Sequence, residues 1–276
     1  MSTAVTHIES SADCLRLVQV TDTHLNRERG GDLLGLDTDF SLQHVLDLVR
    51  KGRPEIDLVL ATGDISDHGS EEAYGRALGY FGQLNSPVMW LPGNHDRADS
   101  MAEILGIDGE LPRLAESSGW QVVMLNSQIP GEVGGRLGAG ELQHLQESLE
   151  DAQHRSLHSL VCLHHQPVAM GSAWIDQQMV EDRDAFLQLI DGFSGVRGIL
   201  WGHVHQQLDR VRNGVKLMST PSTCIQFAPG SDDFKVDDIA PGYRWLDLYP
   251  DGRLETGVVR VEGVEFVIDL NSEGYL

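Results

Sequence analysis

The sequence predicts an α/β fold in which helices are layered against β-sheet. Short apolar runs of buried-strand length recur through the first two thirds of the chain, and segments with the periodicity of amphipathic helices lie between them. The last third carries strand-like segments separated by turn residues, so we expect it to be mainly antiparallel β. At 276 residues the chain has an ordinary length for one such domain.

The predicted elements follow one another in a regular order. Apolar runs predict buried strands, and apolar residues at the spacing of one helical face predict helices. In chain order they are strand 15–20, helix 42–49, strand 58–61, helix 73–81, strand 88–91, strand 122–125, helix 142–149, strand 160–163, helix 186–190 and strand 196–201. Four further strands are expected at 208–211, 216–218, 243–248 and 256–261, with turns at 213–214, 250–252 and 262–263.

Residues 1–13 are expected to form a loose N-terminal tail and residues 14–276 one domain, whose β-rich C-terminal part begins at about residue 206. The first residues lack the basic start and apolar stretch of a secretion signal. No apolar run reaches the ~20 residues that a membrane-spanning helix needs. The cysteines, Cys14, Cys162 and Cys224, have neither metal-knuckle nor redox spacing and suit a reducing compartment. These features predict a cytoplasmic protein without a membrane partner.

The charge of the chain bears on its partners. The formal net charge is -22, and a nucleic acid normally needs clustered Lys and Arg that displace its counterions. DNA and RNA are therefore not expected as partners. A small anionic substrate remains compatible, because bound metal ions can make a site locally positive.

Five short polar motifs each follow an apolar run directly. They are Asp22-Thr23-His24, Gly63-Asp64, Gly93-Asn94-His95-Asp96, His164-His165 and Gly202-His203-Val204-His205. Because open sheets place their ligand crevices at the carboxyl ends of the strands, we expect the motifs to converge on one rim. Asp, Asn and His supply oxygen and imidazole nitrogen, a ligand mixture suited to manganese, iron, zinc or cobalt.

The motifs predict the two-metal site of a phosphoesterase, in which Asp64 bridges the ions. The other predicted ligands are Asp22, His24 and His205 for the first ion, and Asn94, His164 and His203 for the second. Two ions about 3.5–4 Å apart clamp a phosphoryl group and share a hydroxide of lowered pKa. Adjacent histidines on an extended segment face opposite ways, and we assign His164 rather than His165 as the ligand. His95 has no metal in this scheme and is the predicted catalytic acid, with Asp96 orienting its ring.

The five motifs together resemble the signature of the calcineurin-like metallophosphoesterases, over roughly residues 15–205. The resemblance implies a four-layer α/β/β/α sandwich of mixed sheets with the dimetal site on its rim, and the same ligand roles. The stretches 17–25, 90–96, 220–227 and 239–242 resemble in addition the bacterial 3',5'-cyclic-AMP phosphodiesterases of the CpdA type, the class III cyclic nucleotide phosphodiesterases. Gln166 before Pro167 departs from that pattern, where many relatives carry proline or histidine.

This resemblance implies hydrolysis of 3',5'-cyclic AMP to 5'-AMP, which would lower cellular cyclic AMP. The implied cofactor is a pair of divalent ions, with iron or manganese favoured and zinc, cobalt or magnesium as alternatives. The residues expected to contact the substrate are His24, Asp64, Asn94, His95 and His205. The adenine-binding residues are not identified by the sequence: Trp174, Phe227 and residues 223–224 either line the base or simply pack in the fold.

Other functions remain open at this point. The same chemistry would serve a 2',3'-cyclic nucleotide, a glycerophosphodiester or an aryl phosphate, and the motifs do not separate these substrates. A non-catalytic scaffold that binds a partner is a further alternative, but it predicts missing ligands, whereas every expected position is filled. The sequence is compatible with a monomer or a homodimer.

Overall fold

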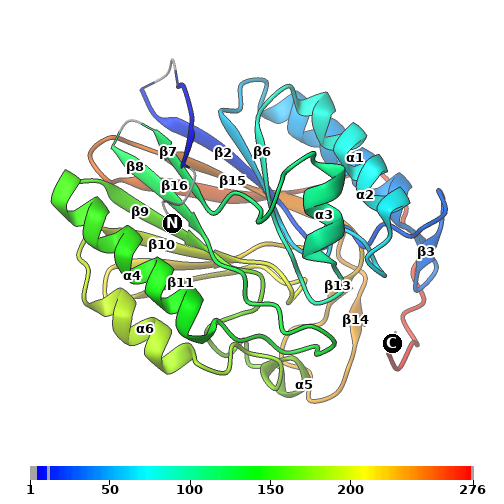
Figure 1. Ribbon diagram of the computed structural model, residues 1–276. Helices are drawn as coiled ribbons and strands as arrows, with labels where there is room; N and C mark the ends of the chain where they lie inside the picture. The colour runs from blue at the N-terminus through cyan, green and yellow to red at the C-terminus, as the bar shows by residue number, and fades with distance from the viewer. Residues whose placement is uncertain (1–4, 11–12, 118, 275–276) are drawn as a thin grey trace.

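Two β-sheets lie face to face and carry helices on both outer faces (Figure 1). This arrangement is seen in the computed structural model, which describes residues 5–10, 13–117 and 119–274. Side chains from both sheets form the central apolar layer, and two further apolar clusters join each sheet to its helices. The four layers α/β/β/α implied by the resemblance are therefore confirmed.

The first sheet has five strands in the order β16-β15-β2-β5-β6. Strands β2 (Leu15–Val20), β5 (Leu58–Thr62) and β6 (Val88–Leu91) run parallel. Strand β15 (Gly242–Leu248) lies antiparallel to both β2 and β16 (Leu254–Arg260). The helices over this sheet are α1 (Thr38–Gly52), α2 (Glu71–Phe81), the short 3-10 helix η1 (Gly82–Leu84) and α3 (Ala98–Ile104).

The second sheet has seven strands in the order β1-β7-β8-β9-β10-β12-β11. Its strands are β1 (Val5–His7), β7 (Leu114–Ser117), β8 (Trp120–Met124), β9 (His158–Cys162), β10 (Val196–Trp201), β11 (Leu208–Arg212) and β12 (Val215–Ser219). Helices α4 (Gly138–Arg155) and α6 (Arg183–Asp191) cover its outer face. The short elements α5 (Ala173–Asp176), β3 (Asp32–Leu33) with β4 (Leu36–Asp37), and β13 (Gln226–Phe227) with β14 (Val236–Asp237) lie outside the two sheets.

The central strands are buried on both faces, which explains their continuous apolar sequences. In β5, Leu58 and Leu60 enter the layer between the sheets, whereas Val59 and Ala61 face the helices. This alternation follows from the two-residue period of an extended chain. All five residues of β5 are buried, and the segment pairs with β2 on one side and β6 on the other, so the apolar run is a strand and not part of a helix.

The amphipathic helices form where the sequence predicts them. The Asp37 side chain caps α1 by accepting a hydrogen bond from the N–H of Phe40 at 2.8 Å. Leu42, Val45 and Val49 on the predicted face of α1 are fully buried against the five-stranded sheet. Burial of this face positions α1, because an isolated helix of this length is only marginally stable in water.

The C-terminal third is mainly antiparallel, as predicted. Strands β11 and β12 form a hairpin through Asn213 and Gly214, which both have positive φ, as this kind of turn requires. The pairs β13–β14 and β15–β16 are antiparallel as well. One pairing differs, since β12 runs parallel to β10 and thereby attaches the hairpin to the seven-stranded sheet.

The N-terminal segment is more ordered than expected. Residues 5–7 belong to the predicted loose tail, but they form β1 and pair in parallel with β7. The apolar side chain of Ile8 then enters the layer between the sheets. Residues 1–4 and 11–12 of the predicted tail lie outside the described residues, and the division at residue 14 stays a prediction. In the described ranges, no helix is long and apolar enough to span a membrane.

Candidate metal centre

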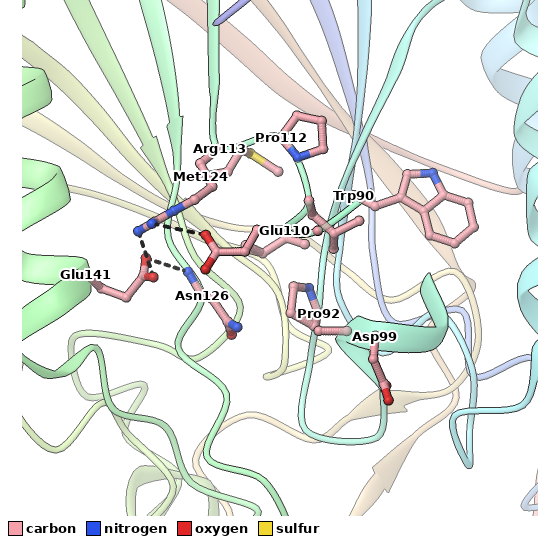
Figure 2. Close-up of a pocket in the computed structure, with 13 residues that line it drawn as sticks. Trp90, Pro92, Asp99, Glu110, Pro112, Arg113, Met124, Asn126 and Glu141 are labelled. Carbon is pink, nitrogen blue, oxygen red and sulfur yellow. Dashed lines mark hydrogen bonds and ion pairs between the residues drawn. The ribbon is translucent and has the colours of Figure 1, made fainter. Parts of the chain in front are cut away.

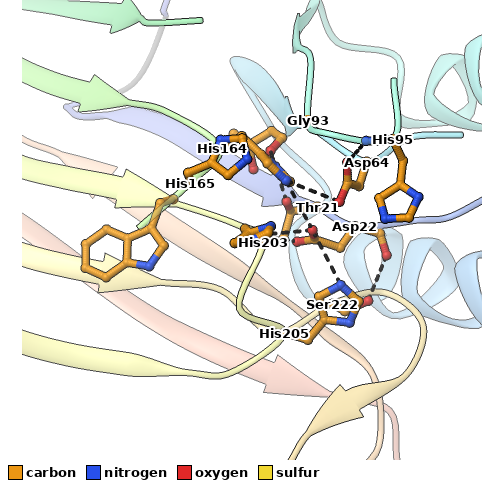
Figure 3. Close-up of polar contacts among 12 residues, drawn as sticks. Thr21, Asp22, Asp64, Gly93, His95, His164, His165, His203, His205 and Ser222 are labelled. Carbon is orange, nitrogen blue, oxygen red and sulfur yellow. Dashed lines mark hydrogen bonds and ion pairs between the residues drawn. The ribbon is translucent and has the colours of Figure 1, made fainter. Parts of the chain in front are cut away.

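All five polar motifs converge at one edge of the sandwich, as predicted (Figure 3). The motifs follow β2, β5 and β6 in one sheet and β9 and β10 in the other. These strands are parallel within each sheet, so their carboxyl ends lie on the same side. Each loop therefore delivers its side chains to a common space between the sheets.

The loops after β2 and β5 run side by side beyond the ends of the strands. The N–H of Asp22 donates to the carbonyl of Gly63 at 2.9 Å, and the N–H of His24 donates to the carbonyl of Asp64 at 2.8 Å. The φ angles of these three ligand candidates, Asp22, His24 and Asp64, are +54°, +44° and +49°. Left-handed backbone is unusual for residues with a Cβ atom and turns these side chains out of the strand direction.

Asp64 lies at the middle of the group. Its Oδ2 is 3.2 Å from Nε2 of His164 and 3.7 Å from Nε2 of His24. The Nδ1 atom of His164 is within hydrogen-bonding distance of the Thr62 carbonyl, at 2.8 Å, which turns Nε2 toward the carboxylate. A Cβ atom on Gly63 would collide with the His164 ring, so glycine is needed for this close approach.

The motif after β10 closes the group from the other side. The N–H of His203 donates to both carboxylate oxygens of Asp22, at 3.0 and 3.1 Å. Nε2 of His205 lies 3.5 Å from Oδ1 of Asp22 and 3.3 Å from Nε2 of His24. Nδ1 of His205 contacts the carbonyl of Ile225 at 2.8 Å, which turns Nε2 toward Asp22.

Several polar atoms of this group are suited to an ion. Within the described ranges, Oδ1 of Asn94 and Nε2 of His203 are buried without a hydrogen-bond partner. Such atoms are rare in native proteins unless they serve a ligand, an ion or a water molecule. One cluster joins Asp22, His24 and His205, and ligand atoms within each cluster lie less than 4.8 Å apart. The donor set therefore fits divalent metal ions.

Metal binding requires neutral imidazoles and ionised carboxylates, and the free site meets this requirement at His203, His205 and Asp64 but not at His164. Burial lowers the pKa of His203 well below its ordinary value and lowers that of His205. Burial acts to raise the pKa of Asp64, but the neighbouring histidines, His164 first, hold it well below its ordinary range. Burial acts to lower the pKa of His164, but the charge of Asp64 and its contact with the ring raise it to about 9.

His95 lies beside these side chains with 11% of its side chain exposed. Its ring centroid is 4.7 Å from that of His24, in an edge-on arrangement. Its backbone N–H donates to Oδ1 of Asp64 at 2.9 Å, which places the imidazole at the rim of the group. A partly exposed imidazole next to the ligands is well placed to exchange a proton with a substrate.

The prediction that Asp96 orients the His95 ring is wrong. The ring is contacted by the backbone of Asp67 instead. The carboxylate of Asp96 accepts hydrogen bonds from the backbone N–H groups of Ile65, Ser66 and Gly93 and from the Tyr74 hydroxyl. It therefore ties the loop after β6 to the loop after β5. Nδ1 of His95 instead lies 2.8 Å from the backbone carbonyl oxygen of Asp67.

Asp67 was missed by the sequence reasoning. Its carboxylate Oδ1 lies 3.1 Å from Nδ1 of His24, so one residue contacts both His24 and His95. Although burial acts to raise its pKa, the hydrogen bond and charge of His24 lower it, so the carboxylate stays ionised. The available sequence signal was a carboxylate three positions after Asp64 in the same loop.

His165 lies beside His164 and His203, and one ligand atom from each of the three lies within 4.8 Å of the others, so the choice of His164 as the ligand stays a prediction. Its Nδ1 is 2.8 Å from Oγ of Ser127, and its ring centroid is 4.7 Å from that of His203. Burial lowers the pKa of His165 to about 3, so the imidazole is neutral. We therefore assign it a supporting place behind His164 and His203.

The loop that carries Asn94 and His95 is held from behind by hydrogen bonds. Nε2 of Gln128 donates to the carbonyls of Gly93 and Asp96, at 2.6 Å each. Beside the loop lies a cavity of about 320 Å³, whose walls include Trp90, Pro92 and the Arg113–Glu141 ion pair (Figure 2). Because this cavity leaves Pro92 without packing on one side, the hydrogen bonds from Gln128 are important for the position of the loop.

Comparison with known proteins gives matches over most of the chain. A family model described as calcineurin-like phosphoesterase matches residues 15–207. A protein of Pseudomonas aeruginosa named 3',5'-cyclic adenosine monophosphate phosphodiesterase CpdA is 44% identical over 259 residues, which cover 94% of each chain. A protein of Escherichia coli (strain K12) with the same name is 40% identical over 263 residues, covering 95% of each chain.

Solved structures agree in fold. A dimetal phosphatase from Danio rerio matches with a TM-score of 0.62 at 16% identity, covering 90% of this chain and 99% of that chain. A purple acid phosphatase from yellow lupin (Lupinus luteus) matches with a TM-score of 0.66 at 13% identity, covering 92% of this chain and 53% of that chain. At such identities the likeness concerns the arrangement of sheets and helices alone.

Proposed function

This chain belongs to the calcineurin-like phosphoesterase family, a family of metal-dependent hydrolases, and we propose that it hydrolyses 3',5'-cyclic AMP to 5'-AMP. The choice of substrate is supported by relatives that are named for this activity and align with about 95% of the chain. The chemistry is supported by one observation above all, the convergence of ligand side chains from both sheets around Asp64. In a cell this activity would lower cyclic AMP.

The proposed cofactor is a pair of divalent ions bridged by Asp64. The other proposed ligands are Asp22, His24 and His205 for one ion, and Asn94, His164 and His203 for the other. Such ions would offset phosphate charge and lower the pKa of a bound water molecule. We propose iron or manganese, with zinc, cobalt or magnesium as alternatives, because the donors are oxygen and imidazole nitrogen.

Among the protein side chains, His95 is proposed to protonate the leaving group. Water attacks phosphorus and loses one proton to solvent while the bond from phosphorus to O3' breaks, and O3' takes one proton to become a hydroxyl, so no net proton is consumed once the donor regains one from solvent. We assign this proton to Nε2 of His95, because Nδ1 faces the Asp67 carbonyl, which can only accept. The phosphate remains on O5', so the product is 5'-AMP.

Substrate binding depends on the charge at the site. The chain has a formal net charge of -22, so an anion is attracted only where ions outweigh the carboxylates of Asp22 and Asp64. Asn94 contributes an oxygen ligand without adding charge, which favours an anionic substrate. His24, Asp64 and His205 are proposed to border the bound phosphate together with Asn94 and His95.

A substrate panel tests this proposal. Metal-loaded protein is given 3',5'-cyclic AMP, 3',5'-cyclic GMP, 2',3'-cyclic AMP and 4-nitrophenyl phosphate under identical conditions, and kcat/KM is compared. We expect the highest value on 3',5'-cyclic AMP. Turnover confined to 2',3'-cyclic AMP and the monoester would reject the cyclic AMP assignment and favour another small phosphate ester. Bound metal without turnover of any substrate would favour a binding scaffold.

A further inference from the structure

We propose that a cavity next to the metal centre binds the nucleotide base, with Trp174 and Phe234 as stacking walls, Phe227 packed between them and His205, and Gln178 as the residue that selects adenine over guanine. This inference rests on the proposed function, because it names a subsite for the same substrate. It concerns residues outside the five motifs.

The cavity is continuous with the proposed catalytic residues. It has a volume of about 190 Å³, and its wall includes Asn94, His95 and His203. A phosphate at the metal centre therefore lies at the edge of this space, and a group attached to the same ribose can enter it. The volume suits one planar base and not a longer stretch of nucleic acid.

Another part of the cavity wall is aromatic. The Trp174 ring centroid lies 4.9 Å from that of Phe227 and 5.1 Å from that of Phe234, and both pairs meet edge to face. Trp174 comes from α5 and the two phenylalanines from β13 and the segment before β14, which lie at the same end of the molecule (Figure 1). Edge-to-face packing leaves ring surfaces at differing angles, against which a flat heterocycle can stack.

Phe227 links this wall to the metal centre. Its ring is stacked on that of His205, with centroids 4.2 Å apart and planes 9° apart. The other candidates from the sequence, residues 223–224, do not line the cavity: Cys224 is fully buried in a cluster with Leu33 and Phe227. The wall therefore has a fixed position relative to the bound phosphate.

Gln178 supplies the polar group that can tell bases apart. It lines the cavity, and its side-chain amide makes no hydrogen bond within the described ranges. The amide N–H of Gln178 can donate to N7 of adenine, and the amide oxygen can accept from the N6 amino group. Guanine presents two acceptors on that edge, N7 and O6, so the amide oxygen would face O6 unfavourably. Gln178 is therefore expected to favour cyclic AMP over cyclic GMP.

The test compares 3',5'-cyclic AMP with ribose 3',5'-cyclic phosphate, which has the same reacting ring but no base. For Trp174→Ala we expect kcat/KM on cyclic AMP to fall roughly 5- to 150-fold more than on the base-free compound, mainly through KM. Trp174→Phe keeps a ring and should restore most of the loss. Phe193→Ala, which removes a ring between α4 and α6, serves as the control and should change neither value.

A second experiment tests whether Gln178 determines the preference for cyclic AMP over cyclic GMP. Gln178→Ala should reduce the preference for cyclic AMP over cyclic GMP by roughly 5- to 150-fold, the range for one lost bidentate pair. Gln178→Arg should shift the preference toward cyclic GMP, because guanidinium donates to both N7 and O6 of guanine. An unchanged ratio in both variants would overturn the role of Gln178.

The outcomes separate this inference from the proposed function. If cyclic AMP is hydrolysed but Trp174→Ala lowers kcat/KM on cyclic AMP and on the base-free compound by the same factor, the base subsite is wrong and the proposed function stands. If neither is hydrolysed, the function is wrong, and calorimetric titration with 5'-AMP still decides the subsite. A Kd for 5'-AMP that does not rise in Trp174→Ala would then overturn it.

Discussion

Nδ1 of His95 lies 2.8 Å from the backbone carbonyl oxygen of Asp67. A carbonyl oxygen only accepts hydrogen bonds, so Nδ1 of His95 carries hydrogen and Nε2 is left to exchange a proton with the substrate. The carboxylate of the same Asp67 lies 3.1 Å from Nδ1 of His24. One residue thus orients a proposed metal ligand with its side chain and the proposed acid with its main chain.

Substitution of Asp67 should separate these two contacts. Asp67→Ala removes the partner of His24 but keeps the carbonyl that faces His95, so metal binding should suffer first. Loss of such a supporting contact typically costs 10–100-fold in metal affinity or activity. Metal affinity measured against a competing chelator checks this. Asp99→Ala, an exposed carboxylate on α3, is the control, and an equal effect of both variants would contradict the prediction.

Substitution of His95 should slow turnover without releasing metal. A positioned general acid contributes about 10²–10⁴-fold, so His95→Ala should lower kcat on 3',5'-cyclic AMP by an amount in that range. A diester with a 4-nitrophenolate leaving group needs little protonation and should be affected much less. Equal losses on both substrates, with full metal content by elemental analysis, would argue against proton donation by His95.

A negative charge at Asn94 should weaken substrate binding. Asn94→Asp keeps an oxygen donor for metal but adds one negative charge to a site that has to attract an anion. KM for the anionic substrate should therefore rise while metal content stays constant. Steady-state kinetics at several salt concentrations check this, since screening by salt should narrow the difference. A KM equal to that of the native protein would contradict the electrostatic argument.

Metal affinity should increase with pH up to about 9. After metal is removed with a chelator, the charge of Asp64 and its contact with the ring outweigh burial and raise the pKa of His164 to about 9. Below that pH a metal ion must displace a proton from His164, and each unit of pH costs about tenfold in affinity. Titrations at pH 7, 8 and 9, corrected for protonation of the chelator, measure the slope. A Kd constant over this range would exclude proton competition at His164.

Arg244 should contribute to stability and not to chemistry. It is fully buried between the sheets, donates to the Ser219 carbonyl at 2.8 Å and pairs with Asp209 at 2.7 Å. Arg244→Ala leaves a void and an unpaired carbonyl, so we expect a loss of about 2–4 kcal/mol in the free energy of unfolding. Arg212→Ala, which breaks an exposed pair with Asp191, should cost less than about 1 kcal/mol. Urea unfolding of both variants gives the comparison, and similar midpoints would contradict it.

The central strands could be predicted from sequence because burial alone specifies them. Strands β2, β6 and β10 begin and end at the predicted residues, since each is a mainly apolar run that ends directly before a polar motif. Strand β1 has three residues and forms through pairing with β7, more than a hundred positions along the chain. No local pattern in such a short segment reports a partner so far away.

The site shows a similar limit. Spacing after each strand indicated which segments converge, because parallel strands of one sheet end on the same side. Directions of side chains in the tight loops were not predictable, and sequence adjacency wrongly favoured Asp96 over Asp67 as the partner of His95. Phe234 was missed for the same reason, since its contact with Trp174 joins distant segments.

The positive φ angles at the metal centre affect which substitutions this sequence can accept during evolution. Of the nine described residues other than glycine with positive φ, five are proposed ligands: Asp22, His24, Asp64, His203 and His205. Each such residue costs free energy that glycine or asparagine would avoid. Selection for heat resistance alone would therefore favour replacement at these positions, so activity and thermostability compete for the same residues. Ancestral or laboratory lineages freed from the catalytic requirement should lose the ligands here before they lose the core.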